Sequence, residues 1–167
     1  MRGIVGWLGV SVVAGLVLLA PVARADDTEN NKKIPLDKVP KAVMGSIKAR
    51  FPGADVTSVE KESENGKVVY DIELKHKGRK YEMDIHEDGT VIEIEKEVAA
   101  KNVPEAVTKA VKARYPRATI HEVMEVNKVK GKKETPDHYE VTLVTADKKE
   151  LEIELSLDGK ILKGGKD

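Results

Sequence analysis

The chain has 167 residues, of which 35% are charged and 4% aromatic, with 29 basic and 29 acidic side chains and no cysteine. The absence of cysteine excludes disulfides, a lipid on an N-terminal cysteine, a thiol nucleophile and a thiolate metal site. The balance of charge, which becomes slightly acidic without Arg2 and Arg24, argues against a nucleic-acid-binding protein, because such proteins carry a clear basic excess.

Residues 1–25 differ in composition from the rest of the chain. Arg2 gives a short positive start, residues 4–20 are apolar or small, and Ala23-Arg24-Ala25 places small residues where a signal peptidase cleaves. We predict a signal peptide over residues 1–25 and a secreted or periplasmic mature protein without a membrane attachment. A retained membrane anchor is the alternative, since the apolar run is near the minimum that spans a bilayer. Residues 26–35 are polar without apolar periodicity, which predicts a disordered tether.

The mature chain contains one unit twice. Residues 39–43 (Val-Pro-Lys-Ala-Val) return as residues 103–107 (Val-Pro-Glu-Ala-Val), and Lys-Ala-Arg-Phe-Pro returns as Lys-Ala-Arg-Tyr-Pro. Matching positions of the two copies are first 64 residues apart in the sequence. This offset becomes 69 where the strand that begins at Tyr70 aligns with the one that begins at Tyr139, and 70 at the two late Asp-Gly pairs. We therefore predict two repeats, residues 36–97 and 100–163. Each is small enough that its core alone is marginal, so the two are expected to pack together.

Each repeat is predicted to begin with a helix and continue with strands. Pro40 and Pro104 fit a first helical turn, with Asp37 and Asn102 as candidate caps, and the helices end before the next proline. Apolar and charged residues then alternate between Gly-containing turns. Strands are expected at about 56–63, 67–75, 79–87 and 90–96, and then at 120–128, 137–145, 148–157 and 160–163. The predicted fold class is α+β, in two tandem repeats, each with one helix packed on a four-stranded antiparallel sheet whose other face is open to solvent.

The alternation predicts which side chains face the helices. The inward set includes Tyr70, Ile72, Leu74, Tyr81, Met83, Ile85, Tyr139, Val141, Leu143, Leu151, Ile153, Leu155 and Leu157, and Phe51 and Tyr115 are also assigned inward. The outward set is rich in carboxylates, with His86 and Glu150 at its margins. From it we select an electrostatic docking face for a protein partner: Asp71, Glu73, Glu82, Asp84, Glu140, Glu152 and Glu154. The alternatives are a Ca²⁺ site, because hard cations bind clustered oxygens, and an ordinary solvated surface.

No pattern in the chain indicates catalysis. The histidines (His76, His86, His121 and His138) lack metal or triad spacing, and no nucleophile elbow, phosphate loop or acid and base pair is present. We predict no catalytic residue, no metal site, no cofactor and no enzymatic activity. Residues 128–133 form a basic hairpin tip that breaks the symmetry of the repeat and suits either an acidic partner or a solvated loop.

These motifs together resemble the PepSY-like domains, a family grouped with the β-lactamase inhibitory protein. The matching features are Val-Pro-x-Ala-Val, Lys-Ala-Arg-(Phe/Tyr)-Pro-x-Ala, Tyr-x-(Ile/Val)-x-Leu and a late Asp-Gly hairpin, over residues 36–163. The resemblance implies an exported α+β module, of a kind that in some members inhibits or regulates an enzyme by docking the open sheet face on it, and it implies no catalytic residues. The chain lacks the inhibitor's cysteines, and its only tryptophan, Trp7, lies in the predicted signal peptide. Tight interfaces usually depend on aromatic anchors, so we expect charge to dominate docking, and a β-lactamase is a poor candidate for the partner.

Overall fold

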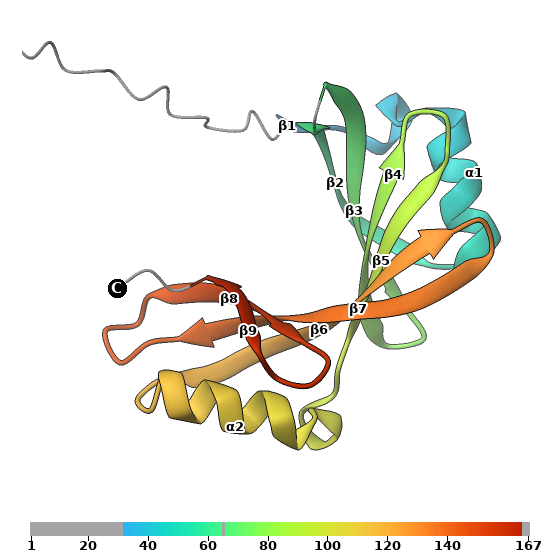
Figure 1. The fold of residues 1–167 in the computed structure, drawn as a ribbon. Helices are drawn as coiled ribbons and strands as arrows, with labels where there is room; N and C mark the ends of the chain where they lie inside the picture. Colours follow the sequence, from blue (N-terminus) through green and yellow to red (C-terminus); the bar gives the residue numbers. More distant parts are fainter. Residues whose placement is uncertain (1–31, 65, 165–167) are drawn as a thin grey trace, which may run out of the picture.

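The computed structural model describes residues 32–64 and 66–164 and has one antiparallel sheet of nine strands in sequence order (Figure 1). A short 3₁₀ turn, a helix and four strands make up each repeat. The first repeat contains η1 (Leu36–Lys38), α1 (Lys41–Arg50), β2 (Asp55–Glu64), β3 (Lys67–His76), β4 (Arg79–His86) and β5 (Val91–Glu97), preceded by β1 (Lys32–Lys33). The second contains η2 (Ala100–Asn102), α2 (Glu105–Arg114), β6 (Thr119–Lys130), β7 (Lys133–Val144), β8 (Glu150–Ser156) and β9 (Ile161–Gly164).

The α+β class is confirmed, but the strands do not form two separate four-stranded sheets. β5 pairs with β6, from Glu93 opposite Lys128 to Glu97 opposite Met124, and this pairing joins both sets of strands into one sheet. An unpaired β5 or β6 would expose a row of backbone N–H and C=O groups, which the pairing satisfies. The long β6–β7 hairpin crosses from one half of the molecule to the other (Figure 1).

Both helices lie on the same face of this sheet, each over the strands of its own repeat. Val43 and Ile47 of α1 pack in one core, and Val107 and Val111 of α2 pack in a second. The predicted inward side chains from the strands are confirmed as buried at Tyr70, Ile72, Leu74, Met83, Ile85, Tyr139, Val141, Leu143, Ile153 and Leu155. Leu157 was predicted to be inward but is 44% exposed, because β8 ends at Ser156 and Leu157 lies in the following turn.

The helix starts differ in detail from the prediction. Pro40 and Pro104 stand at the N-cap positions, with extended ψ angles of 143° and 142°, and the helices begin one residue later. Asp37 and Asn102 lie in the 3₁₀ turns, and neither helix has a side-chain cap hydrogen bond at its N-cap residue. Proline fits here because the N-cap needs no N–H in the helical ladder.

The predicted tether over residues 26–35 is partly wrong. Lys32 and Lys33 form β1 opposite Lys61 and Glu60, and the Ile34 N–H donates to the Val59 carbonyl at 3.0 Å. The rest of that prediction, residues 26–31, and the signal peptide over residues 1–25 lie outside the described part of the chain. No helix within residues 32–64 and 66–164 has the length and apolar character needed to cross a membrane.

The hairpin tip over residues 128–133 contacts the first repeat. Val129 packs on the core beneath α1, and the Arg50 guanidinium at the end of α1 donates to the Gly131 carbonyl at 2.6 Å and to Glu134 at 3.0 Å. The extra length of this hairpin therefore ties the two repeats together. Lys130, Lys132 and Lys133 remain exposed on the tip, so a role toward an acidic partner stays a prediction.

Candidate functional site

The sheet face opposite the helices carries all seven carboxylates that the sequence predicted. Cross-strand pairing places Asp71 opposite Asp84, Glu73 opposite Glu82, and Glu140 opposite Glu154, while Glu152 lies opposite Thr142. Directly opposed residues of an antiparallel pair lie on one face. Six of the seven side chains are half-buried, and Glu152 is exposed. The joined sheet brings the carboxylates of both repeats onto one continuous surface.

The sequence analysis missed other carboxylates of this surface, of which Glu93 and Glu95 of β5 lie at its centre. Glu93 lies opposite Asp84 and Glu95 opposite Glu82, in the strand that joins the two repeats. Their alternation with Ile92 and Ile94 was the signal that could have found them. We call the seven predicted carboxylates and these two the acidic face: Asp71, Glu73, Glu82, Asp84, Glu93, Glu95, Glu140, Glu152 and Glu154. Four more carboxylates, Glu60, Glu62, Glu97 and Glu122, lie around it on the same side of the sheet.

Several carboxyl groups of the acidic face resist ionisation. Burial, followed by the charges of Glu140 and Glu82, raises the pKa of Glu95 to about 9. Burial and the charge of Glu82 raise the pKa of Asp71 to about 7. The pKa of Glu140 is also raised, by burial and then by Glu152. Glu95 is therefore mostly protonated at neutral pH, so the face carries less negative charge than its residue count implies.

Three lysines neutralise part of the acidic face. Lys80 lies 2.7 Å from Glu82 and 3.0 Å from Glu122, Lys163 lies 3.0 Å from Glu154, and Lys128 pairs with Glu93. Burial lowers the pKa of Lys80, but its hydrogen bonds to Glu82 and Glu122 raise that pKa more. The remaining like charges directly oppose one another across the strands, which destabilises a sheet. A surface that accepts this cost is a candidate for binding.

The acidic face also contains buried apolar side chains. Val69 is 1% exposed and Val126 is 0% exposed. Directly opposed residues share a face of the sheet, and these two valines lie opposite His86 and Glu95. Both valines therefore point away from the helices. Met124, opposite Glu97 and Glu140, is 5% exposed on the same face. Neither helix-side core includes these residues. The aromatic side chains of the described residues pack on those two cores, as predicted.

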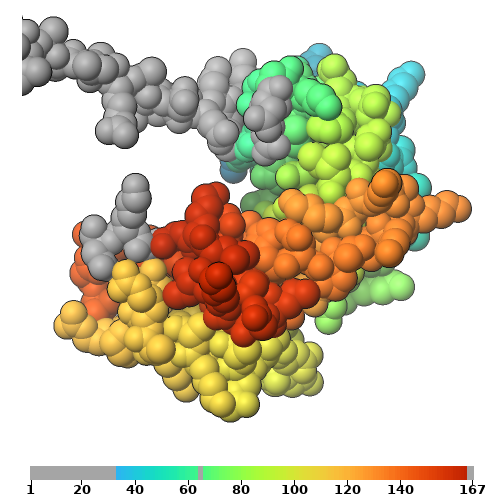
Figure 2. Space-filling model, in the orientation of Figure 1, coloured from blue at the N-terminus to red at the C-terminus, as the bar shows by residue number. Residues whose placement is uncertain are grey.

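A hollow of about 550 Å³ lies on the acidic face, where the strands of the first repeat meet the C-terminal strands. Figure 2 shows the red C-terminal strands below the first repeat, with the orange β6–β7 hairpin between them. The hollow is lined by residues of β4 to β9, among them Asp84, Glu93, Lys128, Leu162 and Lys163.

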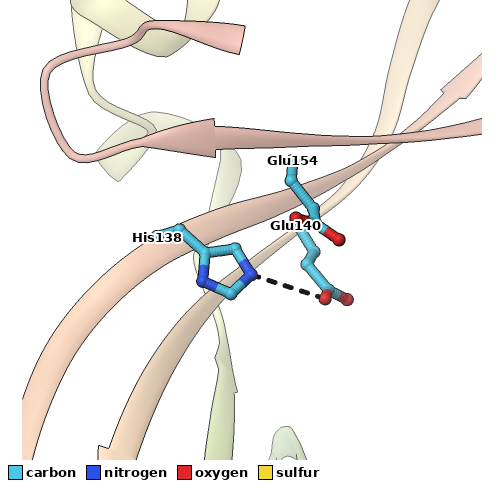
Figure 3. Close-up of side chains that lie close together, drawn as sticks. All are labelled: His138, Glu140 and Glu154. Carbon is cyan, nitrogen blue, oxygen red and sulfur yellow. Dashed lines mark ion pairs between the residues drawn. The ribbon is translucent and has the colours of Figure 1, made fainter. Parts of the chain in front are cut away.

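His138, Glu140 and Glu154 also line this hollow, and their side chains converge (Figure 3). One potential ligand atom from each of the three lies within 4.8 Å of the other two. His138 is not an ordinary surface residue, because its side chain is only 12% exposed.

The other histidines do not form a comparable group within the described residues. His86 lies on the acidic face with its Nδ1 atom buried and without a hydrogen-bond partner. The His76 ring lies 5.6 Å from the Phe51 ring, and His121 is exposed.

Comparison with solved structures shows similarity to a "DUF2874 family protein" from Bacteroides uniformis, with a TM-score of 0.58 and 19% identity, over 75% of this chain and 88% of that one. A "BLIP-like protein" from Bacteroides fragilis gives a TM-score of 0.51 and 20% identity, over 79% and 86%. A protein from Bacteroides eggerthii, named as one of its "putative periplasmic proteins", gives a TM-score of 0.58 and 15% identity, over 76% of this chain and 88% of that one. At these identities the similarity concerns the fold.

No protein of curated function matches the sequence. A family model does match, over residues 26–93 and again over residues 70–163, and these two segments together cover all of the described structure except Gly164. The chain belongs to the beta-lactamase-inhibitor-like, PepSY-like family.

Proposed function

We propose that this protein is an exported, non-catalytic binding module that docks a protein partner on its acidic face and thereby inhibits or regulates an extracytoplasmic enzyme. The observation that carries the proposal is the continuous sheet, which has both helices on one face and nine carboxylates from both repeats on the other. The family and the BLIP-like fold support a docking role, and the predicted signal peptide supports a secreted or periplasmic location.

The chemistry of the acidic face indicates a basic partner. No aromatic side chain of the described residues points outward from it to act as an anchor, so long-range attraction of charges contributes most. A cationic partner that covers Glu95 and Asp71 would favour their ionised forms and lower their raised pKa values. Docking near neutral pH should therefore release protons into the solvent. Calorimetry of the complex in buffers of different ionisation enthalpy measures this release.

The test of the docking face uses charge reversal. We expect the native protein to capture its partner from an envelope extract at low salt, and the Glu82→Lys, Asp84→Lys variant to lose it. The control variant is Asp37→Lys, Glu105→Lys, which reverses two exposed carboxylates away from the acidic face. Raising the ionic strength several-fold above about 0.1 M should also slow association sharply. A partner whose affinity is unaffected by both the reversal and salt would refute docking on this face.

Calcium binding by the same carboxylates is the alternative function, and the crowding of like charges across β3, β4 and β5 is the observation that favours it. Against it, the backbone carbonyls here take part in sheet pairing, whereas Ca²⁺ usually takes several carbonyl ligands from a loop. A calcium titration followed by thermal melting separates the two functions, because an ion bound to the folded state must raise the melting temperature.

A further inference from the structure

The three side chains in the hollow have the geometry of an incomplete metal site. His138 and Glu140 project from the same face of β7, and Glu154 of β8 lies directly opposite Glu140. The His138 Nε2 atom lies 3.6 Å from Glu140 Oε1. Ligand atoms around a tetrahedral Zn²⁺ are about 3.3 Å apart, given bond lengths of about 2.0–2.1 Å. The three ligand atoms here lie within 4.8 Å of one another, and small side-chain rotations would bring them to the spacing of a zinc site.

The neighbour of His138 along the chain prepares the ring to bind a metal. Pairing passes from Val126 opposite His138 to Asn127 opposite Pro136, which leaves Asp137 as an extra residue in a bulge of β7. Asp137 Oδ2 lies 2.9 Å from His138 Nδ1, so the Nδ1–H donates to this carboxylate. In the neutral ring, that hydrogen bond leaves the lone pair on Nε2, an atom that is buried and has no hydrogen-bond partner. A carboxylate that orients a metal-binding histidine is a recurring feature of zinc sites.

The charges around the three ligands favour a cation. Glu140 lies directly opposite Glu154, and Glu152 and Glu93 are close enough for their charges to act on it. Lys163 already places a positive charge 3.0 Å from Glu154, but its side chain is 78% exposed and can move aside. The hollow of about 550 Å³ leaves room for water or another group to complete the coordination.

The first repeat lacks this site. With the offsets of 69 and 70 residues, the positions of His138, Glu140 and Glu154 correspond to Val69, Asp71 and Asp84. His86 lies across from Val69 on β4, yet it joins no group of potential ligands in the described residues. The set of three potential metal ligands therefore occurs only in the second repeat of the described structure. His86, a histidine on the same sheet face without such a group, offers a matched control for replacing His138.

We propose that His138, Glu140 and Glu154 bind a divalent transition metal ion, with Zn²⁺ as the best match. An imidazole nitrogen with two carboxylates suits Zn²⁺, whereas Ca²⁺ takes six to eight oxygen ligands. Asp137 acts through His138 by holding its ring and its tautomer. The site is independent of the proposed docking function, because the ion binds the isolated protein.

The experiment is calorimetric titration of the exported protein, free of any histidine tag, with ZnCl₂. We expect one ion per chain, and a loss of affinity of at least about tenfold in His138→Gln and about tenfold in Asp137→Asn. His86→Gln and His121→Gln should bind as the native protein does, and Lys163→Gln at least as tightly. CaCl₂ at equal concentration should not displace the zinc. Native binding by His138→Gln, an equal loss in His86→Gln, or displacement by calcium would overturn the proposal.

A second measurement on the native chain covers the case in which His138→Gln folds poorly. Nitrogen NMR of the histidine rings should show the His138 Nε2 signal shifting on addition of zinc, with His86 and His121 unchanged. A zinc-induced shift confined to the other rings would refute the assignment even if zinc binds.

Discussion

Gly159 and Gly89 occupy equivalent positions in the two repeats, each against the helix of its own repeat. Gly159 has a φ of +86°, and a Cβ atom there would lie 2.7 Å from the Ala106 carbonyl oxygen of α2. Gly89 has a φ of +88°, and its Cβ would lie 2.9 Å from the Ala42 carbonyl oxygen of α1, while the Ser46 hydroxyl donates to the Gly89 carbonyl at 2.6 Å. Each helix therefore packs directly on the late Asp-Gly turn of its own repeat, which explains why this pair occurs in both.

Replacing Gly159 with alanine should destabilise the protein by more than about 2 kcal/mol, since backbone strain adds to a clash with the helix backbone. The control is Gly131→Ala, where φ is also positive at +63° but the space around the new methyl group is open. That change should cost about 1 kcal/mol. Urea denaturation measures both, and equal costs would show that the Asp-Gly turn does not press on α2.

Neighbouring residues of β3 should differ sharply in their effect on stability. Ile72 is fully buried beneath α1, so Ile72→Ala should cost about 2–4 kcal/mol through lost burial and a residual cavity. Glu73 lies on the acidic face opposite Glu82, so Glu73→Ala should change the free energy of unfolding by less than about 0.5 kcal/mol. Comparable losses in denaturant melts would contradict the observed register.

Most of the acidic face could be predicted from sequence because alternation assigns each strand residue to a face. The convergence of His138 with Glu154 could not, since these residues lie 16 positions apart and meet only through the pairing of β7 with β8. The bulge at Asp137, which helps to aim the imidazole, follows from that same pairing and has no signature in local spacing.

At the level of elements, a polar junction holds the β6–β7 hairpin against the first repeat. Glu134 accepts from Arg50 at 3.0 Å and lies 2.8 Å from Lys96, and all three side chains are between 19% and 31% exposed. This junction lies on the helix side of the sheet, and Asn127, which is 2% exposed, donates there to Glu125. Polar contacts of this kind fix the register of the hairpin more specifically than apolar ones.

Replacing Glu134 with glutamine should cost about 1–2 kcal/mol, because two partly buried cations lose their carboxylate. The matched control is Glu105→Gln, which breaks an ion pair with Lys109 in which both side chains are more than 70% exposed. That change should cost less than about 0.5 kcal/mol. Thermal or urea unfolding compares the variants, and indistinguishable stabilities would show that the junction contributes nothing to joining the repeats.

The helices and hairpins within each repeat were predictable because apolar spacing and Gly-containing turns are local signals. The pairing of β5 with β6 was not, since η2 and α2 separate the two strands along the chain and no tight turn joins them. The extra residues of the second repeat were visible in sequence, but their effect, a hairpin long enough to reach α1, depends on that same joined sheet. Superposition of the two repeats stays a prediction.

For the molecule as a whole, the acidic face links stability to pH. Glu95 and Asp71 have pKa values raised to about 9 and about 7 in the folded state, above those of an unfolded chain. Between pH 5 and 9 the folded protein therefore holds protons that the unfolded chain has released. Stability from these groups is fully present below their unfolded pKa values and is lost as pH rises through the folded ones.

We accordingly expect the melting temperature to fall by at least a few degrees, roughly 1 kcal/mol or more in stability, as pH rises from 5 to 9 in the absence of a partner or metal ion. Asp88, Asp147 and Asp158, whose pKa values are lowered by turn hydrogen bonds, are already ionised across this range and do not oppose the trend. Glu95→Gln should flatten the profile and stabilise the protein at pH 9, because a neutral amide replaces the buried carboxylate among Glu140 and Glu82. Glu150→Gln, at an exposed position, should leave the profile unchanged. A melting temperature that rises toward pH 9, or a Glu95→Gln profile as steep as the native one, would show that the acidic face does not hold these protons.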